Sequence, residues 1–141
     1  MSQSIFIASD HAGFELKSEI IKSSDSSIID LGTKSLDRVD YTDYADILIS
    51  KVLYNDSKGI LICGSGIGMS IAANRNRAIR AGIAFNPEIA KLMRQHNDAN
   101  VLVLPGRFIN IHEALKCINI FLTTIFESGR HQVRIDKINR K

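Results

Sequence analysis

The sequence predicts an α/β protein in which a five-stranded, mostly parallel sheet lies between two layers of helices, with a helical tail at the C-terminus. Apolar runs alternate along the chain with segments of helical periodicity, which is the order typical of strand–helix–strand units. The runs are continuously apolar, as expected for strands that are buried on both faces. A length of 141 residues and an apolar fraction of 45% fit a single domain over residues 1–141.

Each element follows from a local pattern. Strands are predicted at short runs rich in Ile, Val, Leu and Ala, at residues 4–8, 28–31, 59–63, 81–85 and 101–104. Helices are predicted where apolar residues recur three and four positions apart, at residues 12–23, 44–54, 66–76, from 87 to about 95–98, and 111–127. Ser128 and Gly129 are expected to end the last of these, and the serine-rich residues 23–27 are expected to form a loop.

The composition excludes several classes of protein. The apolar run at residues 5–8 is too short for a signal peptide, and no window reaches the apolar length of a membrane span. Two cysteines are too few for a disulfide framework, and they fit a reducing compartment. We therefore expect a cytoplasmic protein that does not insert into membranes.

The C-terminal tail is basic. Residues 130–141 hold five Lys or Arg residues against one acid, in a chain whose net charge is +3. Such a tail is either a solvated face or a surface for anionic ligands. Nucleic acid is not expected as the partner, because aromatic residues make up only 6% of the chain and none interleaves the basic residues of the tail.

Polar and glycine residues follow each predicted strand. They stand at positions 10–11, 32–33, 63–65, 85–86 and 105–107. Because ligands of open α/β sheets bind beyond the carboxyl ends of the strands, these residues are expected to share one edge of the sheet and to form the site.

Residues 59–74 carry the strongest local signal. An apolar run ends at Cys63, glycines follow at 64, 66 and 68, and a helix then begins. The GxGxG spacing and its place after the third strand do not fit the GxGxxG fingerprint, so no dinucleotide cofactor is expected. A helix N-terminus suits an anion, and a thiol there can act as a base or nucleophile. The turn is either a cradle for a phosphate or oxyanion or only a tight connection.

Other polar residues lie at predicted element ends. His11 follows the first strand and His96 closes a helix, while Arg107, Arg130 and Arg134 could clamp a phosphate. No pair of His or Cys residues has a close metal-ligand spacing such as H-x3-H, so no metal is expected. Cys117 lies among apolar residues of a predicted helix and is expected in the core.

Six motifs in order along the chain resemble the type B ribose-5-phosphate isomerase family, whose wider group includes galactose-6-phosphate isomerase subunits. The resemblance covers about residues 5 to 136 and rests on the motifs at 10–14, 30–33, 40–41, 63–68, 94–98 and 129–134. It implies a Rossmann-like three-layer α/β/α sandwich and a cofactor-free, metal-free aldose–ketose isomerase. It also implies a homodimer, or a dimer of dimers, with active sites shared between subunits.

The resemblance also implies roles for individual residues. Cys63 is the base that moves a proton between C2 and C1, and the backbone of Gly64, Gly66, Ile67 and Gly68 stabilises the enediolate with the Ser65 hydroxyl. His96 helps to open the sugar ring, and Asn97 binds substrate from the other subunit. The phosphate is bound by His11, Arg107, Arg130 and Arg134, while Asp10 and Tyr41 line the sugar site.

Three positions depart from the pattern of the family without removing a reactive group. Ser65 stands where Thr is common, Thr42 where Pro is frequent, and Ser128 where Gly is frequent. The expected reaction is the interconversion of D-ribose 5-phosphate and D-ribulose 5-phosphate in the pentose phosphate pathway. The alternatives are a galactose-6-phosphate isomerase subunit and a catalytically silent phosphosugar-binding module.

Overall fold

A computed structural model describes residues 4–24 and 27–141, so part of the predicted loop at 23–27 (Asp25 and Ser26) lies outside the described residues. Five strands form one sheet in the order β2-β1-β3-β5-β4, and every pairing between neighbours is parallel. The strands are β1 (Ile5–Ser9), β2 (Ile28–Asp30), β3 (Lys58–Cys63), β4 (Ala81–Ile83) and β5 (Val101–Pro105). The predicted α/β class and the five-stranded parallel sheet are confirmed.

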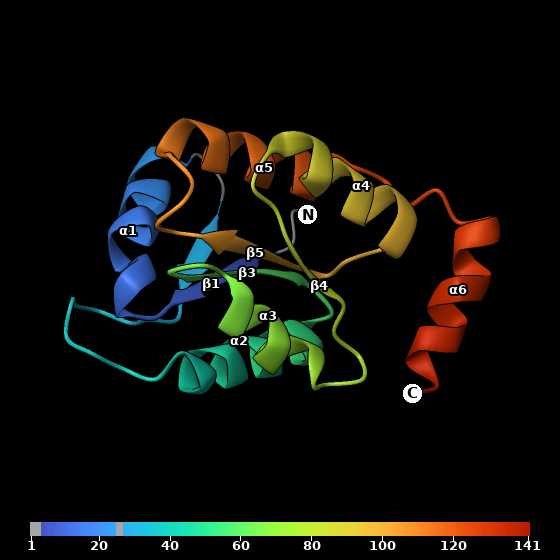
Figure 1. The fold of residues 1–141 in the computed structure, drawn as a ribbon, viewed down its shortest axis with the longest axis horizontal. Helices are drawn as coiled ribbons and strands as arrows, with labels where there is room; N and C mark the ends of the chain where they lie inside the picture. The colour runs from blue at the N-terminus through green and yellow to red at the C-terminus, as the bar shows by residue number, and fades with distance from the viewer. Residues whose placement is uncertain (1–3, 25–26) are drawn as a thin grey trace.

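Helices cover both faces of the sheet, which makes three layers (Figure 1). On one face lie α1 (Phe14–Ser23), α4 (Pro87–Asn97) and α5 (Ile111–Thr123). On the other face lie α2 (Tyr41–Asn55) and α3 (Ile67–Asn74). Alternate strand residues serve the two cores: in β3, Ile60 and Ile62 pack on the first side, and Leu61 and Cys63 on the second. The apolar runs are therefore continuous because the strands are buried on both faces, as the sequence indicated.

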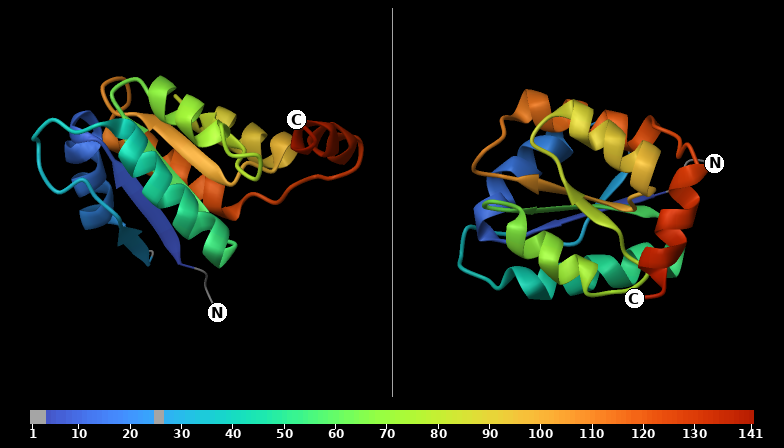
Figure 2. Two further views of the ribbon diagram at one scale, coloured as in Figure 1. Left: turned by 90° about the horizontal axis from the view of Figure 1, so that it is seen from below. Right: turned by 45° about the vertical axis from the view of Figure 1, so that its right-hand side comes forward.

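The final helix, α6 (Arg130–Asn139), stands apart from these layers. It lies beyond the edge of the sheet at which β5 begins, at the opposite end of the strands from their carboxyl termini (Figures 1 and 2). His131 and Ile135 are its buried residues, and the remaining side chains are mostly exposed. The predicted helical tail is thus confirmed, and its basic residues face away from the core.

Two helix boundaries differ from the prediction by three residues or more. The helix predicted at 111–127 ends at Thr123, because the Thr123 and Thr124 hydroxyls donate to carbonyls four residues back, which competes with helix continuation. The chain is then extended at Thr124, whose carbonyl accepts from Arg94. The helix predicted to start at residue 44 begins at Tyr41, after Asp40 in extended conformation.

The strand order places a switch point between β1 and β3. The chain passes from β1 to β2 on one side and then returns to place β3 on the other side of β1. Connections leave the sheet in opposite directions there, which opens a crevice beyond the carboxyl ends of the two strands. None of the helices in the described ranges 4–24 and 27–141 has the length and hydropathy that a membrane span requires.

Candidate active site

An open cavity of about 500 Å³ occupies this crevice. It lies where β1, β3 and β5 end, together with the first turns of α2 and α3. Its walls are formed by Asp10, His11, Ala12, Tyr41, Cys63, Gly64, Ser65, Ile67, Gly68, Ile71 and Arg107. The structure therefore brings together most of the site residues predicted before the fold was known, at the edge of the sheet where they were expected.

Cys63 is the last residue of β3 and faces the start of α3. Its side chain is 5% exposed and belongs to the core between the sheet, α2 and α3, yet it reaches the cavity wall. Cys117 is fully buried in α5, where burial and then the Glu113 carboxylate raise the pKa of its thiol to about 11. The prediction that Cys117 lies in the core is therefore confirmed, whereas Cys63 combines burial with a place at the cavity wall.

The turn after Cys63 leads directly into a helix N-terminus. Gly66 has a φ of 80°, a left-handed conformation that other residues rarely adopt, and as the N-cap residue it has no side chain that could accept from the helix. The Ile67 N–H donates to the Ser65 hydroxyl at 3.2 Å. The first N–H groups of a helix lack partners within it, so the next N–H groups of this first turn offer donors and a partial positive charge to the cavity.

The loop after β5 is tied to the same turn. The Gly106 N–H donates to the Cys63 carbonyl at 2.8 Å, and the Arg107 N–H donates to the Gly64 carbonyl at 2.9 Å. The Arg107 guanidinium consequently lies over Gly64, where a Cβ at that position would be 3.1 Å from Nη1. A cation thus lies over the turn that links Cys63 to the helix start.

Two hydrogen bonds orient the residues after β1. The Asp10 carboxylate accepts from the Gly13 N–H at 3.1 Å and begins the short helix η1 (His11–Gly13). The Val39 N–H donates to His11 Nδ1 at 3.2 Å. Because Nδ1 accepts this bond, the proton of a neutral His11 ring stands on Nε2, which is then a donor to a ligand.

A buried ion pair supports the loop that carries Val39. Lys17 is 1% exposed, and its ammonium donates to both oxygens of Asp30, at 2.8 and 2.9 Å, and to the Thr33 carbonyl at 2.8 Å. The Thr33 N–H donates to the Ser9 carbonyl at 2.9 Å, beside Asp10. The loop after β2 is therefore anchored against the end of β1, next to His11.

Tyr41 closes one side of the cavity. Its ring lies against Gly68, where a Cβ would come within 2.6 Å of the ring. Only glycine allows this close approach of α2 to the first turn of α3. The Tyr41 side chain, 39% exposed, is thereby held at the cavity wall.

The other predicted site residues lie at the opposite edge of the sheet. His96 and Asn97 end α4, which leads back to the start of β5, and Arg130 and Arg134 are on α6. At about 3.3 Å per residue, the five residues of β5 separate the two edges by roughly 16 Å. A single chain therefore does not bring these four residues to the cavity that Cys63 lines.

Local contacts define this second group. The His96 ring stacks on His131 with 4.3 Å between centroids and 16° between planes. The Asn97 carbonyl accepts from Arg80 Nε at 2.9 Å, and Asn97 borders a separate open cavity of about 690 Å³ between α3, α4 and α6. Arg130 and Arg134 are exposed and, one helical turn apart, share a face of α6.

Several residues around these two groups had not been singled out as site residues. Ala12 and Ile71 line the cavity; Ile71 is 54% exposed and stands one turn after Ile67 on α3, so its helical spacing could have revealed it. His131 and Glu127 lie close to His96. No sequence spacing indicates this contact, because the helical pattern predicts a helix through Glu127, whereas α5 ends at Thr123.

Comparison with known proteins decides the family. Residues 5–138 match the Ribose/Galactose Isomerase family. The chain belongs to this family. The match spans nearly the whole chain, including both groups of site residues, and it confirms the resemblance drawn from the six motifs. Members of the family are isomerases, so the predicted enzyme class is confirmed as well.

Individual members of the Ribose/Galactose Isomerase family agree in sequence and fold. The chain is 42% identical over 133 residues to ribose-5-phosphate isomerase B of Escherichia coli, covering 92% of this chain and 89% of that protein. The crystal structure of a ribose 5-phosphate isomerase from Thermotoga maritima is 46% identical, with a TM-score of 0.93 and full coverage of both chains. Ribose-5-phosphate isomerase B from Mycoplasma genitalium, solved with bound ribulose-5-phosphate, is 44% identical, with a TM-score of 0.91 and coverage of 99% and 96%.

Proposed function

We propose that the chain catalyses the interconversion of D-ribose 5-phosphate and D-ribulose 5-phosphate through an enediolate, as an enzyme of the pentose phosphate pathway. The observation that carries this proposal is the position of Cys63 in one open cavity with a helix N-terminus, His11 and Arg107. An isomerase of this kind needs a base, donors for an oxyanion and an anchor for the phosphate, and the cavity wall offers each of them.

Cys63 is the base in this proposal. As a thiolate it takes the proton from C2 of the open-chain aldose, the electrons of the C–H bond form the C1–C2 double bond, and the carbonyl oxygen becomes the enediolate oxyanion. A proton then moves from O2 to O1, which leaves the negative charge of the enediolate on O2. The same thiol returns its proton to C1 as the C2 carbonyl forms, so no external oxidant or reductant is needed. The start of α3 and the Ser65 hydroxyl face the position where negative charge develops. Each well-placed donor of this kind contributes about 2.7–4 kcal/mol.

The phosphate end of the substrate is assigned to cationic and N–H donors. His11 offers Nε2–H because its Nδ1 is already an acceptor, and Arg107 lies over Gly64. Arg130 and Arg134 add two guanidinium groups that match phosphate oxygens. Binding of the phosphate, away from the reacting carbons, holds C1 and C2 in position beside the base. The binding energy of the phosphate thereby lowers the barrier to proton transfer.

The proposed enzyme acts as a homodimer. His96, Asn97, Arg130 and Arg134 lie at the far edge of their own sheet. Side chains required for ring opening and phosphate binding can therefore reach Cys63 only from a second copy of the chain. We assign His96 to acid–base chemistry in ring opening and Asn97 to substrate binding at the site of the neighbouring copy.

The test is isomerase kinetics on ribose 5-phosphate with wild type, Cys63→Ala and the matched control Cys117→Ala. We expect turnover by wild type and the control, and a loss of about 10²- to 10⁴-fold in kcat for Cys63→Ala, the range for a general base. Normal turnover by Cys63→Ala would refute the base assignment. Wild-type turnover on galactose 6-phosphate alone would indicate the galactose enzyme, and no turnover on either sugar would indicate a silent binding module.

A further inference from the structure

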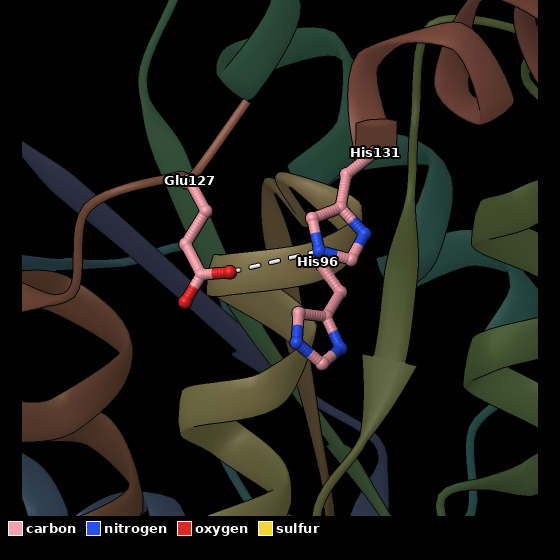
Figure 3. Close-up of side chains that lie close together, drawn as sticks. All are labelled: His96, Glu127 and His131. Carbon is pink, nitrogen blue, oxygen red and sulfur yellow. Dashed lines mark ion pairs between the residues drawn. The ribbon is translucent and has the colours of Figure 1, made fainter. Parts of the chain in front are cut away.

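Three metal-ligating side chains meet at the far edge of the sheet, away from the cavity of Cys63. His96, Glu127 and His131 each place one ligand atom within 4.8 Å of the other two (Figure 3). They come from the end of α4, from the extended segment before α6, and from the first turn of α6. This grouping is a product of the fold, since the three residues are separated by up to 35 positions in the sequence.

Backbone hydrogen bonds hold the three residues together. The Glu127 N–H donates to the Gln95 carbonyl at 3.0 Å, which fixes Glu127 beside the last turn of α4. The Arg94 side chain donates to the Thr124 carbonyl at 3.3 Å and ties the same segment three residues earlier. The His131 N–H donates to the Ser128 carbonyl at 3.1 Å. The cluster is therefore built on an anchored backbone, as a binding site requires.

One ligand atom of the cluster is buried without a hydrogen bond. His131 is 6% exposed, and its Nε2 has no hydrogen-bond partner among the described residues. The nearest carboxylate oxygen, Glu127 Oε1, is 3.6 Å away, beyond hydrogen-bonding distance, and the ring points into the cluster (Figure 3). Buried polar atoms are almost always satisfied, so an orphaned nitrogen aimed at two other ligands indicates a missing partner.

The ligand atoms of the cluster favour a cation as that partner. Two imidazoles and one carboxylate each bring one ligand atom to the same place. A ring nitrogen of a neutral imidazole that carries no proton offers a lone pair. Metal ions are bound by neutral imidazole, whereas an organic cation or a water molecule would make weaker use of two nitrogens and a carboxylate.

We propose that His96, Glu127 and His131 form a binding site for a divalent transition-metal ion of the zinc class. Two imidazoles and one carboxylate are a ligand set that zinc uses with an open fourth position, whereas the hard cations Mg²⁺ and Ca²⁺ prefer oxygen ligands. With Zn–N and Zn–O bonds of about 2.0–2.2 Å, ligand atoms on one tetrahedral zinc lie ~3.4 Å apart. The cluster must therefore contract from its present span of 4.8 Å.

The distances between the ligand atoms can shorten through movement of the two less buried side chains, Glu127 and His96. Glu127 has an exposed side chain and His96 is half-buried. The lone pair of an imidazole nitrogen lies in the ring plane, so the stacked rings of His96 and His131 must splay from their 16° arrangement when they bind one ion. Metal binding and His96–His131 stacking are mutually exclusive.

This exclusion has a consequence for catalysis that rests on the proposed function. A metal ion on His96 removes the side chain assigned to ring opening in the neighbouring copy, so occupancy inhibits the isomerase. Binding of the metal itself does not depend on that assignment, and the two can fail separately.

The direct test is competition for Zn²⁺ between the full-length protein and a chromophoric chelator. We expect one zinc per chain in wild type and in Cys63→Ser, which removes the thiol that lines the cavity. Glu127→Gln and His131→Asn are expected to weaken binding at least about tenfold. The matched controls Glu88→Gln and His112→Asn, which alter exposed residues elsewhere, are expected to bind as wild type. Glu127→Gln changes an exposed side chain, so it remains informative if His131→Asn fails to fold.

Two results would overturn the site. Stoichiometric zinc binding that survives Glu127→Gln and His131→Asn but disappears in Cys63→Ser would place the metal in the cavity. An absence of stoichiometric binding by wild type would reject the site altogether.

Inhibition of the isomerase by the metal is tested separately. Wild-type isomerase activity should fall with added Zn²⁺ and return with chelator, whereas Glu127→Gln should need at least about tenfold more metal for the same inhibition. Binding without inhibition would refute the role of His96 and leave the metal site standing.

Discussion

The two edges of the sheet hold the predicted site residues in different ways. At the carboxyl edge, Cys63, His11 and Arg107 are fixed by backbone hydrogen bonds and by the buried pair of Lys17 and Asp30. At the opposite edge, the arginines Arg130 and Arg134 extend from a peripheral helix. The first group forms a cavity within the chain, and the second is exposed at the far end of the molecule.

This difference fits the roles that we propose for Cys63 at one edge and for the two arginines of α6 at the other. Groups that must act on a carbon–hydrogen bond need placement within a fraction of an ångström, and rigid strand ends and a helix start provide it. Groups that bind a phosphate can be delivered from a separate surface, because a guanidinium accepts a range of approaches to an anion that carries several oxygens. In the homodimer that we propose, the exposed edge of one chain would complete the cavity of the other.

The largest effect that would sharpen this comparison is expected at Arg134. Arg134→Ala should remove the charge-assisted contact to the phosphate that we propose, worth about 1.5–3 kcal/mol, so we expect KM for ribose 5-phosphate to rise about ten- to a hundredfold. Steady-state kinetics measure it, with Arg140→Ala as a control that removes the same charge from the last turn of the tail. An unchanged KM for Arg134→Ala would show that α6 is only a solvated face.

A smaller effect is expected from loosening the carboxyl edge. Lys17→Met keeps the length of the buried side chain but removes its bonds to Asp30 and to the Thr33 carbonyl. Loss of one partner of a fully buried pair costs about 3–5 kcal/mol, and Asp30 is 34% exposed, so its charge regains water and the expected loss of unfolding free energy is about 1–3 kcal/mol.

Urea denaturation measures the stability change, and kinetics should show a rise in KM of a few fold, because the loop that orients His11 is less firmly anchored. Lys22→Met, at an exposed position of the same helix, is the control and should change neither quantity. A stability as high as that of wild type would show that the Lys17 network does not secure this edge.

The sequence predicted the carboxyl-edge group well because its causes are local. A continuous apolar run, a left-handed Gly66 and the helix after it are all visible in residues 59–74, and parallel-sheet topology then places the ends of β1, β3 and β5 together. The Cys63 assignment as base remains a prediction of the family resemblance, since the fold positions the thiol but does not show proton transfer.

The opposite edge was less predictable because its contacts are tertiary. The end of α5 at Thr123 depends on hydroxyl bonds within the helix, and the extended segment after it follows α4 through bonds from Arg94 and to Gln95. Helical periodicity alone predicts that this helix continues through Glu127. It therefore gives no sign that Glu127 lies beside His96 and His131. The helix propensity of single residues does not depend on hydrogen bonds to distant segments, so it cannot predict where such bonds end a helix.

Subunit mixing tests most directly whether one active site takes residues from two chains, as we propose. Cys63→Ala and His96→Ala are each expected to lose at least about 10²-fold in kcat. Equal amounts of the two variants are denatured together, refolded and assayed on ribose 5-phosphate. In a mixed dimer with shared sites, both changes fall in one site and the other site is intact.

Random pairing makes half of the dimers mixed, so we expect recovery of about a quarter of wild-type activity in the refolded mixture. Each variant refolded alone serves as the control and should stay inactive. If the mixture shows only the mean of the two inactive variants while mixed dimers are demonstrated to form, each chain carries its own Cys63 and His96 in one site, and the shared site is refuted.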